Sequence, residues 1–88
     1  MKLKDGFILR QVAGAWVVVA VGSASVNFNG LLTLNESGVL LWRALENGAD
    51  RQGLIDAITA EYEVTEDVAA ADIDEFLASI RESGCLED

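Results

Sequence analysis

The stretch Asn29–Leu45, NGLLTLNESGVLLWRAL, changes from a strand pattern to a helix pattern with almost no loop between the two. Its first part is short and apolar up to Leu34, as is typical of a strand. The Asn35 side chain can accept a bond from a free backbone N–H in the first turn of a helix, and Glu36 suits the positive end of the helix dipole. Apolar residues then recur at helical spacing, at Leu41, Trp42 and Leu45. We therefore expect a strand that runs directly into a helix.

Two further strand-like segments precede this stretch. Phe7–Val12 and Trp16–Val21 are rich in β-branched and aromatic residues, and Ala13–Gly14 between them favours a turn. The third strand is expected over Phe28–Leu34, where Gly30 marks a bulge or a close approach of another backbone. These segments predict a three-stranded antiparallel sheet.

Three helices are expected after the sheet. The capping residues at their starts are Asn35, Asp50 and Thr65. The second helix has its apolar residues on one face, at Leu54, Ile55, Ile58 and Tyr62. The core stripe of the third helix comprises Ala69, Ile73, Phe76, Leu77 and Ile80. Asn47–Gly48 and Gly84 are typical of helix ends, and after Gly84 the segment Cys85–Leu86 either folds back or frays.

The order of three strands followed by three helices favours an α+β fold over a βαβ sheet. A three-stranded antiparallel sheet beside a compact trio of helices is a winged helix-turn-helix-like architecture. The 88 residues suit one domain spanning 1–88, and a hydrophobic content of 51% supplies a core that needs no metal or disulfide. The single cysteine, Cys85, cannot form an internal disulfide and is best explained as a small core residue, which fits a reducing, cytoplasmic location.

Charge is distributed unevenly along the chain and argues against nucleic acid as a partner. Residues 1–45 hold four basic and two acidic residues, a net charge of +2, whereas residues 46–88 hold two basic and thirteen acidic residues, a net charge of −11. The third helix would enter DNA in a winged helix protein, but here it is strongly acidic, and phosphate binding needs clustered Lys and Arg. The acidic half is either a solvated surface or a face toward a basic partner. No apolar run reaches the roughly 18 residues of a membrane span, and the N-terminal segment does not resemble a signal peptide, so no membrane partner is expected.

The residue types needed for most catalytic sites are missing. The chain has no histidine and one cysteine, which excludes most nucleophile–base pairs and zinc sites of the Cys/His type. Neither GxGxxG nor the P-loop pattern occurs, so no phosphate-binding loop is indicated. Asp72 and Glu75 lie three residues apart on one helix face, but such a pair is more often a solvated surface than a catalytic dyad. We expect a protein that is not an enzyme and that holds no metal or cofactor.

Three segments, LNESGVLLWRALENGAD, LIDAITAEYEV and DIDEFLASIRESGCLE, follow one another in the pattern of a known family. Together they resemble the PqqD-like peptide chaperones, also called RiPP recognition elements, over about Phe7–Glu87. Each motif alone has low specificity, but the combined order and spacing of the motifs are fairly specific. The sequence departs from the pattern at Ser37, where Thr is usual, at Asp50–Arg51, where Thr or Ser is common, and at Cys85, where Leu is expected. It also lacks the proline-bearing tract of the pyrroloquinoline quinone pathway member.

The resemblance implies a winged helix domain that binds the leader part of a ribosomally made precursor peptide. In that family the leader adds as a strand to the edge of the three-stranded sheet and lies against the third helix. The domain then presents the precursor to a modifying enzyme, often a radical S-adenosylmethionine (radical SAM/SPASM) protein. The implied partners are therefore a precursor peptide and such an enzyme. Mapped onto this sequence, the expected peptide-binding residues are Phe28, Gly30, Leu31, Leu32, Thr33, Asp72, Glu75, Phe76 and Ser79.

Several alternatives stay open at this point. Leu34 and Trp42 are better explained as core than as binding residues. The expected groove wall on the third helix is the flank with Asp72, Glu75, Phe76 and Ser79, and the opposite flank comprises Ala70, Asp74 and Arg81. The alternative function is an acidic winged-helix interaction or regulatory module without a role in peptide maturation. The sequence does not decide between a monomer and a homodimer.

Overall fold

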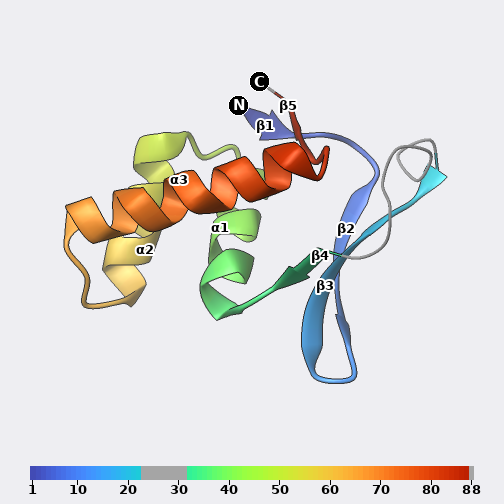
Figure 1. The fold of residues 1–88 in the computed structure, drawn as a ribbon, viewed down its shortest axis with the longest axis horizontal. Helices are drawn as coiled ribbons and strands as arrows, with labels where there is room; N and C mark the ends of the chain where they lie inside the picture. The colour runs from blue at the N-terminus through green and yellow to red at the C-terminus, as the bar shows by residue number, and fades with distance from the viewer. Residues whose placement is uncertain (23–31, 88) are drawn as a thin grey trace.

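The computed structural model of this protein describes residues 1–22 and 32–87, and Figure 1 shows how their elements are arranged. The strands are β1 (Lys2–Leu3), β2 (Phe7–Val12), β3 (Ala15–Ala20), β4 (Leu32–Leu34) and β5 (Leu86–Glu87). The helices are α1 (Glu36–Glu46), α2 (Arg51–Glu61) and α3 (Glu66–Glu82). The sheet β2-β3-β4 lies to one side of the helices. This order confirms the predicted α+β, winged helix-turn-helix-like architecture.

The three-stranded sheet is antiparallel, with β3 in the middle. Ala13 and Gly14 connect β2 to β3 with φ angles of 52° and 82°, so both residues adopt the left-handed conformation that a two-residue hairpin turn favours. β3 begins and ends one residue earlier than predicted. Of the predicted third strand the structure describes Leu32–Leu34, which pairs with β3 so that Leu34 lies opposite Trp16. β4 is therefore an edge strand of the described sheet.

The three helices begin at the predicted capping residues. The side chains of Asn35, Asp50 and Thr65 each accept a hydrogen bond from the backbone N–H three residues further on, at 2.8, 2.8 and 3.3 Å. Because each bond satisfies a donor that the first helical turn leaves free, a local side chain fixes each start. Within residues 1–22 and 32–87, no helix combines the length and the apolar character needed to cross a membrane.

The core forms where the helices meet the inner face of the sheet. Its large, fully buried side chains are Trp42, Leu54, Ile73, Ile80, Val18 and Cys85. Leu34 of β4 joins the same cluster, which confirms that Leu34 and Trp42 are core residues. Tyr62 does not belong to this cluster, contrary to the prediction that it shares the apolar face of α2. The helix ends before Tyr62, whose extended backbone carries the side chain out of the apolar stripe and leaves it 39% exposed.

A second, two-stranded sheet goes beyond what the sequence pattern indicates. β1 pairs antiparallel with β5, so the two ends of the chain meet near the C-terminal end of α3 (Figure 1). The backbone N–H of Lys4 donates to the carbonyl of Cys85 at 2.8 Å. Cys85 and Leu86 are buried in the core cluster, and this burial raises the pKa of the Cys85 thiol to about 11. Of the two alternatives for this segment, folding back is therefore confirmed.

Candidate functional site

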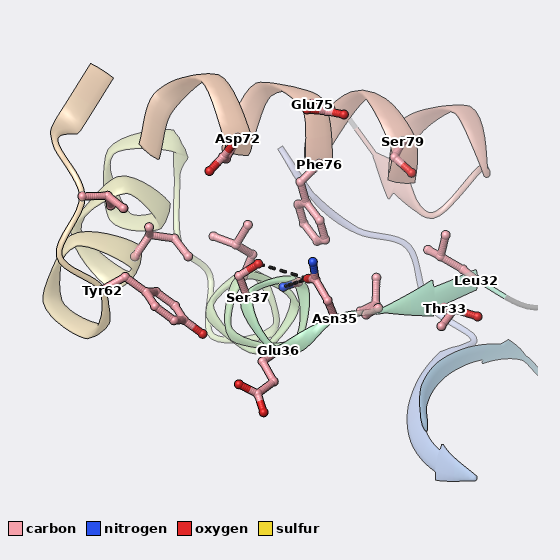
Figure 2. A pocket seen from close by; sticks show the side chains of 15 residues that line it. Leu32, Thr33, Asn35, Glu36, Ser37, Tyr62, Asp72, Glu75, Phe76 and Ser79 are labelled. Atoms are coloured by element: carbon pink, nitrogen blue, oxygen red, sulfur yellow. Dashed lines mark hydrogen bonds between the residues drawn. The ribbon is translucent and has the colours of Figure 1, made fainter. Parts of the chain in front are cut away.

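An open cleft of about 1020 Å³ lies between the edge of the sheet and α3 (Figure 2). It is lined by β4, by the first residues of α1, by one flank of α3 and, at one end, by Ile58, Tyr62 and Val64. Figure 2 shows α3 running along the cleft, with Ser79 at the end near Leu32 and Asp72 at the end near Tyr62. An elongated ligand suits this shape better than a compact one.

β4 forms one wall of the cleft and brings its backbone to the edge of the sheet. Within the described residues β4 pairs with β3 alone, so the N–H and C=O groups on its other side have no strand partner. Thr33 is exposed, whereas Leu32 is half-buried and Leu34 is buried against the core. This alternation is that of a strand with one face on the core. An open edge beside a cleft is a template for the addition of another strand.

The junction between β4 and α1 explains why strand and helix follow each other without a loop. Asn35 directly follows β4 and caps α1, and its Oδ1 accepts bonds from the Gly38 N–H at 2.8 Å and from the Ser37 hydroxyl at 3.0 Å. A Cβ on Gly38 would lie 3.2 Å from Asn35 Oδ1 and 3.3 Å from Leu34 Cβ. The glycine therefore lets the first turn of α1 lie directly against the end of the edge strand.

The expected groove-wall residues of α3 lie together on the cleft. Their spacing of three and four residues puts them on one helix face, and all four line the cleft: Asp72, Glu75, Phe76 and Ser79. Phe76 is half-buried, packs against the core cluster and points its ring into the cleft toward Asn35 (Figure 2). The other three side chains are exposed. This wall thus offers an apolar ring flanked by polar groups.

The opposite flank of α3 faces α2. Arg51 donates to both carboxylate oxygens of Asp74, at 2.9 and 3.0 Å. The hydrogen bond, together with the opposite charge, lowers the pKa of Asp74 and raises the pKa of Arg51. None of Ala70, Asp74 and Arg81 lines the cleft. Of the two flanks, the one that begins at Asp72 is therefore the one that borders the cleft.

The charged side chains on the cleft are acidic. Glu36 begins α1, Asp72 and Glu75 lie on α3, and neither Lys nor Arg is present among the described residues that line the cleft. Within residues 1–22 and 32–87, no group of three or more His, Cys, Asp or Glu side chains is arranged to hold a metal ion. The site can therefore offer a ligand an open strand edge, an apolar ring and negative charge.

Six of the nine expected binding residues line the cleft, namely Leu32, Thr33, Asp72, Glu75, Phe76 and Ser79. The other three, Phe28, Gly30 and Leu31, lie outside the described residues. The cleft residues that the sequence-based expectation omits are Leu34–Gly38, Leu41, Ile58, Tyr62 and Val64. The sequence holds no clear signal for Tyr62, because its position depends on whether α2 ends at Glu61 or one residue later. The role of these residues in binding stays a prediction.

The comparisons with known proteins agree with this architecture. The family described as coenzyme PQQ synthesis protein D (PqqD) matches residues 15–86. A solved structure of TbiB1 in complex with the TbiA(beta) leader peptide is similar to this chain, with a TM-score of 0.80 and 25% identity over 99% of this chain and 95% of that chain. A lasso peptide synthetase B1 complexed with the leader peptide has a TM-score of 0.78 and 23% identity over 99% of this chain and 96% of that chain. No curated protein matches. Because the family match spans most of the sequence, the chain belongs to the PqqD family, as the resemblance indicates.

Proposed function

We propose that this protein binds the leader of a ribosomally made precursor peptide in an extended conformation, along β4 and against α3. The observation that carries the proposal is the open edge of β4 beside a cleft whose opposite wall bears Phe76. A peptide added there pairs its backbone with the edge and places alternate side chains toward the cleft. The proposed binding residues are Leu32, Thr33, Asp72, Glu75, Phe76 and Ser79, together with Phe28, Gly30 and Leu31 from the sequence alone.

Backbone pairing and side-chain contacts must both contribute to such binding. A hydrogen bond formed in water contributes a net of about 0.5–1.5 kcal/mol to stability. The described part of β4 has three residues, and its backbone can pair with a peptide only on the side that does not face β3. Pairing along these three residues alone is too weak to hold a peptide. The apolar contacts with Leu32 and Phe76 therefore have to supply a large share of the affinity.

The comparisons support this proposal in two ways. The similar TbiB1 structure is a complex with a leader peptide, and the similarity extends over nearly the whole of both chains. The match to the PqqD family covers both β4 and the flank of α3 that borders the cleft. The lasso peptide synthetase B1 structure supports the shared fold.

We further propose that the protein is an adaptor and not a catalyst. The chain has no histidine, and a pKa of about 11 makes the buried Cys85 thiol a poor nucleophile at neutral pH. A separate enzyme, such as a radical SAM/SPASM protein, then modifies the precursor that the cleft holds. Incubation of the precursor with this chain alone should leave the precursor mass unchanged. A mass change in the absence of the partner enzyme would contradict the adaptor role.

A titration followed by NMR tests the binding site. The probe is the synthetic leader of the precursor encoded beside this protein's gene, and a scrambled peptide of the same composition is the control. Amides of Leu32, Thr33 and the cleft flank of α3 should shift, and those of the hairpin turn at Ala13 and Gly14 should not. Shifts confined to the β2–β3 hairpin, or equal shifts with the scrambled peptide, would be evidence against the proposed site.

A further inference from the structure

The cleft differs in character along its length. Its apolar part lies beside β4 and comprises Leu32, Leu34 and Phe76. Its carboxylates are those of Glu36 on α1 and of Asp72 and Glu75 on α3; Asp72 lies toward Tyr62, whereas Glu75 lies beside Phe76. Figure 2 shows Asp72 directed from α3 into the cleft, at the same end as Tyr62. Since no Lys or Arg is present among the described lining residues, a cation that enters this end meets only negative charge.

The apolar ring and the Asp72 carboxylate are spaced to suit an extended chain. Phe76 and Asp72 are four residues apart on α3, which puts them on the same helix face about 6 Å apart along the axis. In a strand, residues i and i+2 point to the same side and lie about 6.6 Å apart. A strand in the cleft can therefore set one side chain against Phe76 and the side chain two residues away beside Asp72.

The direction of an added strand follows from the direction of β4. β4 runs from Leu32, near Ser79, toward the start of α1, on the side of Asp72 (Figure 2). Every strand pair in residues 1–22 and 32–87 is antiparallel, and antiparallel pairs are the commoner kind in proteins. An antiparallel strand has its N-terminal end near Asp72. The peptide residue beside Asp72 thus precedes the one that contacts Phe76.

We propose that the cleft selects leaders in which a Lys or Arg stands two residues before an apolar residue. This inference rests on the proposed function and adds the chemistry of the peptide to it. The apolar side chain packs against Phe76, the basic side chain meets Asp72, and Glu75 and Glu36 add to the attraction. Because these carboxylates are exposed, the basic residue discriminates among leaders, while backbone pairing and the apolar contact supply most of the affinity.

Selection from a displayed library of short random peptides tests this inference. Three forms of the protein are used in parallel: the unaltered chain, the cleft variant Asp72→Asn/Glu75→Gln and the control variant Glu46→Gln/Glu82→Gln. The control removes the same charge at exposed positions that do not line the cleft. The unaltered and control proteins should enrich Lys or Arg two residues before an apolar residue, several-fold over the reverse order. The cleft variant should lose that preference and still enrich apolar peptides.

The possible outcomes separate this inference from the proposed function. Enrichment of basic residues without a preferred position, or equally by all three proteins, would reflect general attraction to an acidic protein and would overturn the inference. Enrichment of the reverse order would overturn the strand direction on which it depends. Apolar peptides selected without basic residues would overturn the inference and leave the proposed function intact. A selection in which no peptide shifts the amides of Leu32 and Thr33 would contradict both.

A single selected peptide makes the charged contact measurable. Replacing its Lys by Gln should weaken binding to the unaltered and control proteins by about two- to five-fold, the range of an exposed ion pair. Binding to the cleft variant should change less, because the partner carboxylates are already gone. The loss of affinity caused by replacing the Lys should become smaller with added salt, since exposed charges are screened within about 10 Å at 0.1 M. Equal losses on all three proteins would show that the Lys does not contact Asp72 or Glu75.

Discussion

The two flanks of α3 both carry exposed carboxylates but differ in what faces them. Both expose carboxylates, yet Asp74 is paired with Arg51 of α2, whereas Asp72 and Glu75 form no ion pair within the described residues and border the cleft. A helix that buries one stripe of its surface has a flank on each side of that stripe. On α3 one flank closes against a neighbouring helix and the other remains open. A carboxylate therefore forms an ion pair with a neighbouring helix on one flank and is available to a ligand on the other.

The described elements beside the cleft flank are short compared with α3. α3 has 17 residues, about 25 Å of helix, whereas β4 has three residues, about 10 Å of strand. At its C-terminal end β4 stops at Leu34, and the chain turns directly into α1. A groove is left along α3 that a longer, added strand would fill. The predictions below test whether the two flanks have these separate roles.

Ile73→Ala should destabilise the whole fold, so that neither flank of α3 keeps its role. Ile73 is fully buried on the stripe between them, and truncation of such a residue costs about 2–5 kcal/mol because it leaves a cavity. Urea unfolding should show this loss in the free energy of unfolding, and leader binding should fall with it. Val68→Ala is the control on the same helix, since Val68 is 50% exposed and should change stability little. An equal effect of the two changes would refute the assignment of the core stripe.

Phe76→Ala should impair the cleft flank more than the fold. The ring is half-buried, so its loss should cost about 1–3 kcal/mol of stability, while leader affinity should fall by about tenfold or more because the apolar wall is lost. Fluorescence anisotropy with a labelled leader measures the affinity, and thermal unfolding measures the stability. Phe76→Leu should restore most of the stability and part of the affinity. Unchanged affinity in Phe76→Ala would show that the peptide does not lie against this wall.

The features that could be predicted from sequence are those that local side chains determine. Asn35, Asp50 and Thr65 each cap the helix that follows, and a cap needs only the backbone N–H three residues on. That Asp72, Glu75, Phe76 and Ser79 share one face of α3 was likewise predictable, because positions three and four residues apart lie on the same side of a helix whatever that helix packs against. For this reason the residue pattern was enough to predict the architecture, whereas the expectation that this face of α3 borders a groove came from the family resemblance.

Features that depend on distant contacts could not be predicted in the same way. β1 and β5 have two residues each, too few for a periodic pattern, and they form because the chain ends meet over the core. The position of Tyr62 depends on where α2 ends, since one further residue of helix would have kept it on the apolar face. Which flank of α3 stays open depends on the partner of Arg51, and neither Asp72 nor Asp74 reveals this in the sequence.

Two single changes on α3 compare the flanks directly. Asp72→Asn should weaken leader binding by about two- to five-fold at low salt, if the leader carries the basic residue proposed above. Asp74→Asn removes the same charge two residues away, on the flank that faces α2, and should leave the affinity unchanged. Titrations at low and high salt measure the leader affinity of both variants, and only the loss of affinity in Asp72→Asn should depend on salt. Equal losses in the two variants would mean that the peptide responds to the overall charge of α3 and not to the cleft flank.

The smallest expected effect concerns the flank that faces α2 and depends on pH. Arg51 lowers the pKa of Asp74 in the folded chain, so the native state binds a proton less readily there than the unfolded state, whose Asp pKa is about 3.9. The pair therefore stabilises the fold at pH values above the unfolded pKa, and this contribution disappears as the pH falls through the lower, folded pKa. Asp74→Asn should be slightly less stable than the unaltered chain at pH 7, and the difference should vanish in acid and decrease with salt.

Arg51→Gln should cause a similar loss of stability, and the double variant should lose no more than either single variant if the two side chains act as a pair. The loss of stability in Asp74→Asn could instead persist at pH 2, or add fully to the loss in Arg51→Gln. Either result would show that Asp74 contributes to stability through something other than this ion pair. The contrast between the two flanks would then need another physical basis.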